Sequence, residues 1–402
     1  MSNKSHKNSS PPALWSDKHS VEKSSIIVLI ISFVLFFCAL FVIHSEDILH
    51  GAADIFLYER EGEIVEYETA TVNDIISESM EPQETADGAF TGQQKISVTI
   101  NSGQYKEEEM TADVFFAPLN GVPVSKGDKV VLFLKTRANG DRYASVYEIN
   151  RIPVLAAFLL LFFAAVMIIG GLTGLKSLIG LIFTVICLFV ILIPLLLKGA
   201  PTILTTFVLC AYLALVNFTI LGGVHRKTIS AFLGTVTGTF LAMIFGLAVQ
   251  TLSKINGFRL EDAEPLLQMK QVGLSIHIQG LLVASIIICA LGAVMDVAMS
   301  ISSSLEEVHA ANPQLSRNEL FRSGMNIGRD MVGTMTNTLI LAFLGSEFTL
   351  IIFIYSRGMS FYQLYSSAFV TLETISGLSS SLGMILAIPL TAFISSTLIK
   401  KS

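Results

Sequence analysis

The sequence predicts an α-helical membrane protein that crosses a bilayer about eight times and carries one small extracytoplasmic β-domain. Hydrophobic residues make up 52% of the 402 residues, and charged residues only 14%. Several apolar runs approach the roughly 20 residues that a helix needs to cross a bilayer. The one long polar segment, residues 44–151, alternates polar and apolar residues as β-strands do. Together these features indicate a polytopic membrane protein.

The apolar runs predict spans near residues 26–43, 152–171, 177–197, 203–221, 229–251, 278–299, 334–356 and 381–399. A count of roughly seven or nine remains open, because residues 361–380 are neither clearly polar nor clearly apolar. This stretch contains Glu373 and predicts an interfacial or re-entrant helix. The run 26–43 is long and no small-residue cleavage site follows it, so it predicts a retained anchor rather than a signal peptide.

The distribution of basic residues predicts the orientation. Residues 1–25 are polar, lack apolar periodicity and predict a disordered tail. Lys and Arg gather in this tail, after the span near 203–221 and at the C-terminus, which places them on one side for an even number of spans. The positive-inside rule then makes both termini cytoplasmic and residues 44–151 extracytoplasmic.

The polar segment predicts a barrel. The runs 63–72 and 95–100 alternate polar and apolar residues, and part of 129–135 does the same. About five short strands favour a small closed barrel of the OB type or similar. The consecutive acids Glu107, Glu108 and Glu109 lack the spaced ligands and turn glycine of a calcium loop, so they predict a solvated acidic surface.

The four cysteines all lie in apolar spans, without metal-binding spacing. They therefore exclude a disulfide framework in the polar segment. The sequence predicts no metal site and no cofactor.

Small and polar residues recur along one face of the predicted helix near 278–299. Gly292, Asp296, Ser300 and Ser303 are three or four residues apart, so they share one side of the helix, and Glu307 continues the series. An ionisable residue in a membrane span is costly and by default marks a functional site. Asp296 is therefore a candidate for binding a cation or carrying a proton.

The segment that re-enters the membrane near residue 334 is polar as well. Because it runs antiparallel to the preceding helix across a cytoplasmic loop, we expect Asp296 to form an ion pair with Arg329. An alternative assigns Arg329 to lipid headgroups, Asp330 to a helix cap and the serines to helix packing. The full set of candidates for a substrate or ion pocket is Asp296, Ser300, Ser303, Asn326, Arg329, Asp330, Thr334, Asn337 and Glu373.

Glycines predict close helix packing. Gly234 and Gly238 form a G-x-x-x-G pair, which lets helix backbones approach each other, and Gly292 and Gly333 are further candidates for packing. Such faces serve either another helix of the chain or a second subunit. We therefore expect a homo-oligomer or a pair with a related membrane protein, besides the lipid bilayer itself, and no nucleic-acid partner.

Three strings of residues carry a family resemblance: 292–300, 328–330 with 333–338, and 389–392. They resemble the YibE/F-like multi-pass membrane proteins of Gram-positive bacteria, and the resemblance extends over nearly the whole chain from residue 26. It implies a bacterial plasma-membrane protein whose transmembrane domain occupies residues 152–402 with about seven helices. The outer domain resembles that of the longer, YibE-like members. Relatives occur as adjacent pairs, and permease is their usual functional assignment.

The sequence favours a permease, or a subunit of one, for a small solute or ion, because interrupted spans and a polar pocket are typical of such proteins. It contains no G-x-x-x-x-G-K-[ST] loop, so it gives no support for ATP-driven pumping by this chain alone. One alternative is a sensor or assembly platform that uses the outer domain. Another is an intramembrane enzyme with an Asp296–Asp330 carboxylate pair. The absence of H-E-x-x-H and of a Ser–His pair at useful spacing disfavours the enzyme, and we predict no catalytic residue.

Overall fold

The computed structural model describes residues 26–38, 64–82, 90–117, 121–137, 140–255, 266–268, 270 and 275–400. The predicted tail of residues 1–25 and the first part of the polar segment lie outside the described residues. The chain divides into two compact units. One comprises Leu49–Ile169, and the other comprises Met1–Ile48 with Gly170–Ser402.

The smaller unit contains a closed barrel of five strands. These are β1 (Ile64–Pro82), β2 (Phe90–Ile100), β3 (Glu109–Phe116), β4 (Lys129–Thr136) and β5 (Arg142–Ile149). Their order is β1-β2-β3-β5-β4, and β1 closes the barrel by pairing with β4. Only the β3–β5 pair is parallel. The expected five-strand barrel is thus confirmed.

Strand β1 is long enough to pair with both of its neighbours. Its first half pairs with β4 and its second half with β2. The register shifts between Val72 and Asp74 and again between Ile75 and Ser77, and such irregularities bend a strand. Alternate residues point inward, so side chains such as Ile96, Val98 and Leu132 are completely buried. The apolar residues at every second position of the strands therefore form the core of the barrel.

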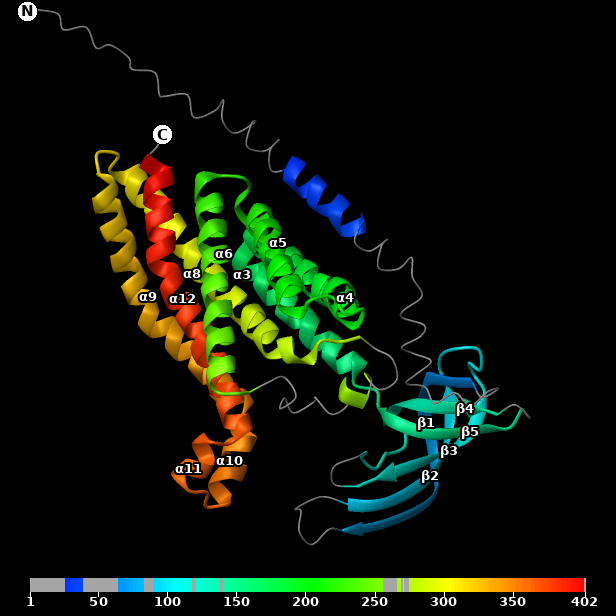
Figure 1. Cartoon of the computed structure of the whole chain (residues 1–402). Coiled ribbons are helices and arrows are strands. Elements are labelled where there is room, and N and C mark those ends of the chain that lie inside the picture. The colour runs from blue at the N-terminus through cyan, green and yellow to red at the C-terminus, as the bar shows by residue number, and fades with distance from the viewer. Residues whose placement is uncertain are drawn as a thin grey trace, which may run out of the picture. The chain divides into compact units, whose positions relative to one another are not determined.

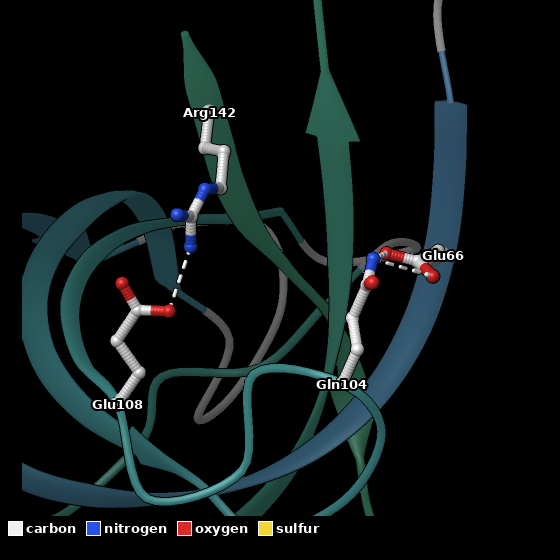
Figure 2. A network of polar contacts seen from close by, with 4 residues as sticks. All are labelled: Glu66, Gln104, Glu108 and Arg142. Carbon is white, nitrogen blue, oxygen red and sulfur yellow. Dashed lines mark hydrogen bonds and ion pairs between the residues drawn. The ribbon is translucent and has the colours of Figure 1, made fainter. Parts of the chain in front are cut away.

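Side chains hold the turn between β2 and β3 against neighbouring strands (Figure 2). The Gln104 amide donates to Glu66 Oε2 at 3.0 Å, and Arg142 Nη1 donates to Glu108 Oε2 at 2.7 Å. The Arg142 guanidinium also lies 4.2 Å from the Tyr105 ring centroid, and its hydrogen bond to Glu108 raises the Arg142 pKa. Of the acids in the predicted acidic surface, Glu108 therefore forms an ion pair, with Arg142.

The first long helix, α3 (Ile152–Cys187), crosses the boundary between the two units. Gly171 interrupts it with φ 55° and ψ −135°, a conformation that favours glycine. The helical run continues through η1 (Leu188–Leu192) and α4 (Ile193–Leu197). Its 46 residues would extend about 69 Å if straight, more than twice the roughly 30 Å of a bilayer core. The predicted spans 152–171 and 177–197 thus lie in one helical run with a break at Gly171.

The larger unit is helical. Its further helices are α5 (Thr202–Gly222), α6 (Arg226–Leu252), α8 (Leu281–Ala311), α9 (Arg317–Ser346), α10 (Phe348–Ser356), α11 (Phe361–Tyr365) and α12 (Ala368–Lys400). In Figure 1, α9, α12 and α6 stand side by side, and α8 passes behind them. Helix α8 packs against α5, α6, α9 and α12, and its apolar window is 56% buried. It is the central helix of the unit.

Within the described residues, five helical segments are long and apolar enough to cross a membrane. They are Ile152–Leu197, Thr202–Gly222, Arg226–Leu252, Ile278–Ala311 and Val370–Ile399. The pair α9–α10, bent by 62°, makes a sixth if it counts as one span. The apolar helix Ile26–Cys38 is shorter, and the rest of the predicted span 26–43 lies outside the described residues. A mostly helical, membrane-compatible protein is therefore confirmed, whereas the count of about eight spans is not.

The predicted cytoplasmic loop near 300–333 is mostly helical. The stretch 361–380, predicted as an interfacial or re-entrant helix, contains α11 and the first part of α12. Helix α8 continues to Ala311, and α9 begins at Arg317 with a capping box in which Ser316 and Glu319 bond each other's backbone N–H. Helix α12 begins at Ala368, so it includes Glu373. Helices tolerate polar residues where they extend beyond an apolar run, which is why composition alone predicted these helices too short.

Candidate functional site

An uncovered polar stripe runs along the central helix. Cys289, Gly292, Asp296 and Ser300 are exposed, while the opposite side of α8 is buried. Every exposed residue of this stripe is small or polar, although the helix lies in the apolar part of the chain. Asp296 is exposed, and within the described residues no ion pair or hydrogen bond engages its carboxylate. It therefore needs water, a ligand or another subunit to stabilise its charge.

Helix α9 presents a second uncovered polar face. Its inner side is buried at Leu320, Gly324 and Gly328, where the glycines approach α8 and α12. Its exposed side carries Asn326, Arg329, Asp330, Gly333, Thr334 and Asn337. The Thr334 hydroxyl donates to the Met331 carbonyl oxygen of its own helix, at 3.2 Å. The amides and charged groups remain available for an external partner.

The expected ion pair between Asp296 and Arg329 is not formed. An ion pair in the described part of the helical unit instead joins Lys227 of α6 to Glu306 of α8, at 2.9 Å. Helical periodicity placed both residues correctly on polar faces, but each face points away from the helix packing. Ser303 is half-buried, and the neighbouring Ser302 shares a hydrogen bond of 3.0 Å with Ser395 of α12. That serine pair binds two helices together.

A separate cavity lies where α9 bends into α10. It has a volume of about 220 Å³ and is lined by side chains of α9, α10 and α12. Glu347, the residue at the bend, and Glu373 of α12 are its only acidic lining residues among those described; the walls are otherwise mainly apolar, with Phe343 and Leu350 as examples. Gly377 makes room for the Phe343 ring, since an added Cβ would lie 3.2 Å from it.

Glu373 lines this cavity, whereas the other sequence candidates on α8 and α9 do not. Glu373 lies within electrostatic range of Cys289, so it approaches the α8 stripe from the α12 side. Sequence reasoning missed Glu347. The signal was a lone carboxylate between the apolar run 339–344 and the apolar run 350–354, directly after Gly345 and Ser346.

The packing glycines fall into two groups. Gly234 and Gly238 are buried where α6 meets α12, and a Cβ on Gly238 would lie 2.6 Å from Ala387 Cβ. By contrast, a Cβ on Gly292 or Gly333 would meet nothing within 4 Å in the described chain. The second group therefore contributes to the uncovered faces and not to packing within the chain.

The sequence and these helices can be compared with known proteins. A family model described as YibE/F-like protein matches residues 158–401. The chain belongs to the YibE/F-like family. No curated protein and no solved structure matches it. The resemblance carried by the three strings is thus confirmed, and the match includes α5 to α12 but not the barrel strands. Both acidic regions of this YibE/F-like protein, the α8–α9 faces and the cavity at Glu347, lie within the family match.

Proposed function

We propose that this YibE/F-like protein is a permease, or a subunit of one, for a small cation or a proton-coupled solute in a bacterial plasma membrane. The supporting observation is the uncovered carboxylate of Asp296 on the central membrane helix. Hydroxyl and amide side chains accompany it on α8 and α9, and such groups replace part of the hydration shell of an ion. The proposed orientation has both termini in the cytoplasm and residues 44–151 outside.

The balance of charge favours a cation over an anion. The two acidic regions contain four acids, Asp296, Asp330, Glu347 and Glu373, which outnumber the basic residues Arg322 and Arg329 on the exposed face of α9. Carboxylates in a low-dielectric setting attract cations and protons strongly, because water screens them little. In the proposed mechanism, Asp296 binds the cation or proton, and Ser300 with Asn337 orients it. Arg329 limits the net negative charge.

The bent helix pair supports transport over a static role. Permeases of several folds bind their substrates beside discontinuous helices, whose ends provide partial charges inside the membrane. Here α9 ends at Ser346 and α10 begins at Phe348, with the Glu347 carboxylate lining the cavity between them. Movement of α10 relative to α9 would open or close this cavity. Glu347 and Glu373 are then proposed to form a second binding site for the cation.

Reconstituted vesicles test the proposal. Liposomes that contain the purified full chain are loaded with a dye that responds to the ion under test and are exposed to gradients of H⁺, Na⁺, K⁺ or Mg²⁺. We expect ion flux above that of empty liposomes. In Asp296→Asn this flux should fall by at least about tenfold, because asparagine keeps the shape of the side chain but lacks the negative charge that binds the ion. Glu307→Gln is the matched control, because it removes an exposed acid from the same helix beyond its apolar run. Wild-type flux in Asp296→Asn would contradict the assignment.

We also propose that a second copy of the chain covers the uncovered faces of α8 and α9. These faces carry both charge signs, so two copies related by a two-fold axis can pair Arg329 of one with an aspartate of the other. Gly292 and Gly333 allow the close approach that membrane helices need. A related membrane protein is the alternative occupant.

Cys289 offers a direct probe, because it is exposed on the same α8 face. In a Cys38→Ser background, mild oxidation in membranes should give a disulfide-linked dimer that Cys289→Ser abolishes. Native mass measurement then distinguishes two copies from a pair with a relative. A monomeric particle that forms no cross-link would contradict the proposed pairing.

A further inference from the structure

A large groove lies between α5 and α6, away from both acidic regions. Its volume is about 1020 Å³, and the first turns of α5 and the second half of α6 form its walls. Phe207 and Phe240 meet at one end, with ring centroids 5.8 Å apart, and Met243 and Leu247 continue the apolar lining along α6. From Phe240 to its end at Leu252 the helix rises about 18 Å. This length exceeds the roughly 15 Å of one leaflet's hydrocarbon layer.

The other end of the groove is basic and rich in hydrogen-bonding groups. Lys254 and His277 line it, both side chains are exposed, and no ion pair engages either one in the described chain. Lys254 has φ 53° just after α6, a left-handed conformation that a lysine rarely adopts without support. Helix α5 begins beside them at Thr202, with no side-chain cap on its first turn. The positive end of its dipole therefore adds to the positive potential at this end of the groove.

Hydrogen bonds fix the geometry of this basic end. Gln250 Nε2 donates to the Gln279 carbonyl oxygen at 2.9 Å and so ties α6 to the segment before α8. Thr202 Oγ1 donates to the His277 carbonyl oxygen at 3.0 Å and ties the same segment to α5. The two walls are therefore held at a set distance before any ligand binds, which lowers the cost of binding.

We propose that this groove binds one anionic phospholipid. Its acyl chain lies along Met243 and Leu247 toward the Phe207–Phe240 pair, and its phosphate lies beside Lys254 and His277. An apolar trough of membrane length that ends in exposed basic side chains, without an ion pair to any described residue, matches an anionic amphiphile in both charge and shape. A neutral lipid satisfies only the trough, and a free phosphate only the basic end. This site does not depend on the proposed transport activity.

Native mass spectrometry of the full chain in detergent tests the assignment. The protein is mixed with equal amounts of dioleoyl phosphatidylglycerol and dioleoyl phosphatidylcholine at pH 7.0, and retention of each lipid is measured. We expect wild type to prefer phosphatidylglycerol, and the double variant Lys254→Gln/His277→Gln to lose at least about fivefold of that preference. Lys176→Gln, at another exposed lysine of a membrane helix, should retain it.

Two further arms identify the ligand and the place. Leu247→Trp fills the trough and should reduce retention of phosphatidylglycerol, and inorganic phosphate at equal concentration should fail to displace the lipid. Equal preference in the double variant and in wild type would overturn the basic end as the headgroup site. Unchanged retention in Leu247→Trp would overturn the trough, and displacement by phosphate would assign the site to a free anion.

Discussion

Replacing Gly238 with alanine should destabilise the helical unit, whereas the same replacement at Gly292 should not. At Gly238 an added Cβ would lie 2.6 Å from Ala387 Cβ and 2.8 Å from Val294 Cγ1, well short of the 3.4 Å at which ordinary contact begins. Backbone atoms of Gly383 stand 3.2 Å away, so α12 cannot yield locally. At Gly292 the new methyl group would enter open space.

Two opposing terms set the magnitude. Overpacking of a well-packed interface costs roughly 1–3 kcal/mol, while alanine gains about 1 kcal/mol over glycine inside a helix. The free energy of unfolding should thus fall by up to about 2 kcal/mol for Gly238→Ala and rise by up to about 1 kcal/mol for Gly292→Ala. Because the helix term is common to both variants, their difference of about 1–3 kcal/mol isolates the contact with α12 and α8.

The buried cysteines provide the assay. Cys187 and Cys210 have no exposed surface, so a thiol-reactive fluorogenic dye labels them only when the helices separate. Serine at the exposed Cys38 and Cys289 removes the background. Each kcal/mol should shift the melting temperature by roughly 2–4 °C. If Gly238→Ala and Gly292→Ala change the melting temperature equally, the close approach of α6 and α12 is wrong.

Three other predictions concern the barrel and the helix core. The isolated segment 44–151 should give a β-type circular dichroism spectrum and a cooperative melt, since its closed core is self-contained; a helical or structureless spectrum would contradict this. Burial, and then the charge of Asp113, raise the Tyr143 pKa, so this stabilising effect is present below pH 10 and is lost as the pH rises through the folded-state pKa. An absorbance titration of the isolated segment 44–151 checks this, because Tyr143→Phe should remove a tyrosine whose pKa is raised. Thr235→Val should be nearly neutral in the dye assay because its buried hydroxyl has no partner, whereas Ser302→Ala should cost about 1 kcal/mol because its partner loses a hydrogen bond.

The barrel and the existence of the membrane helices follow from local patterns. A strand shows its inward residues every second position, so the alternation in 95–100 already identifies Ile96 and Val98 as core. A bilayer requires long apolar runs, so composition identifies the helical segments. The family strings are also local, and the family match confirms them. What local patterns missed were helix ends, because α8 and α9 continue through polar sequence.

The direction in which each helical face points was decided by tertiary structure alone. Periodicity places Asp296 and Ser300 together on α8, but it contains no information about where the neighbouring helices pack. The same residue type therefore has opposite environments: Gly238 is buried against α12, and Gly292 is uncovered. The cavity at Glu347 likewise requires α9, α10 and α12 to meet, and no pattern within one helix predicts how they pack. Sequence determined which residues share a face, and packing determined what that face meets, because burial depends on long-range contacts that no short pattern encodes.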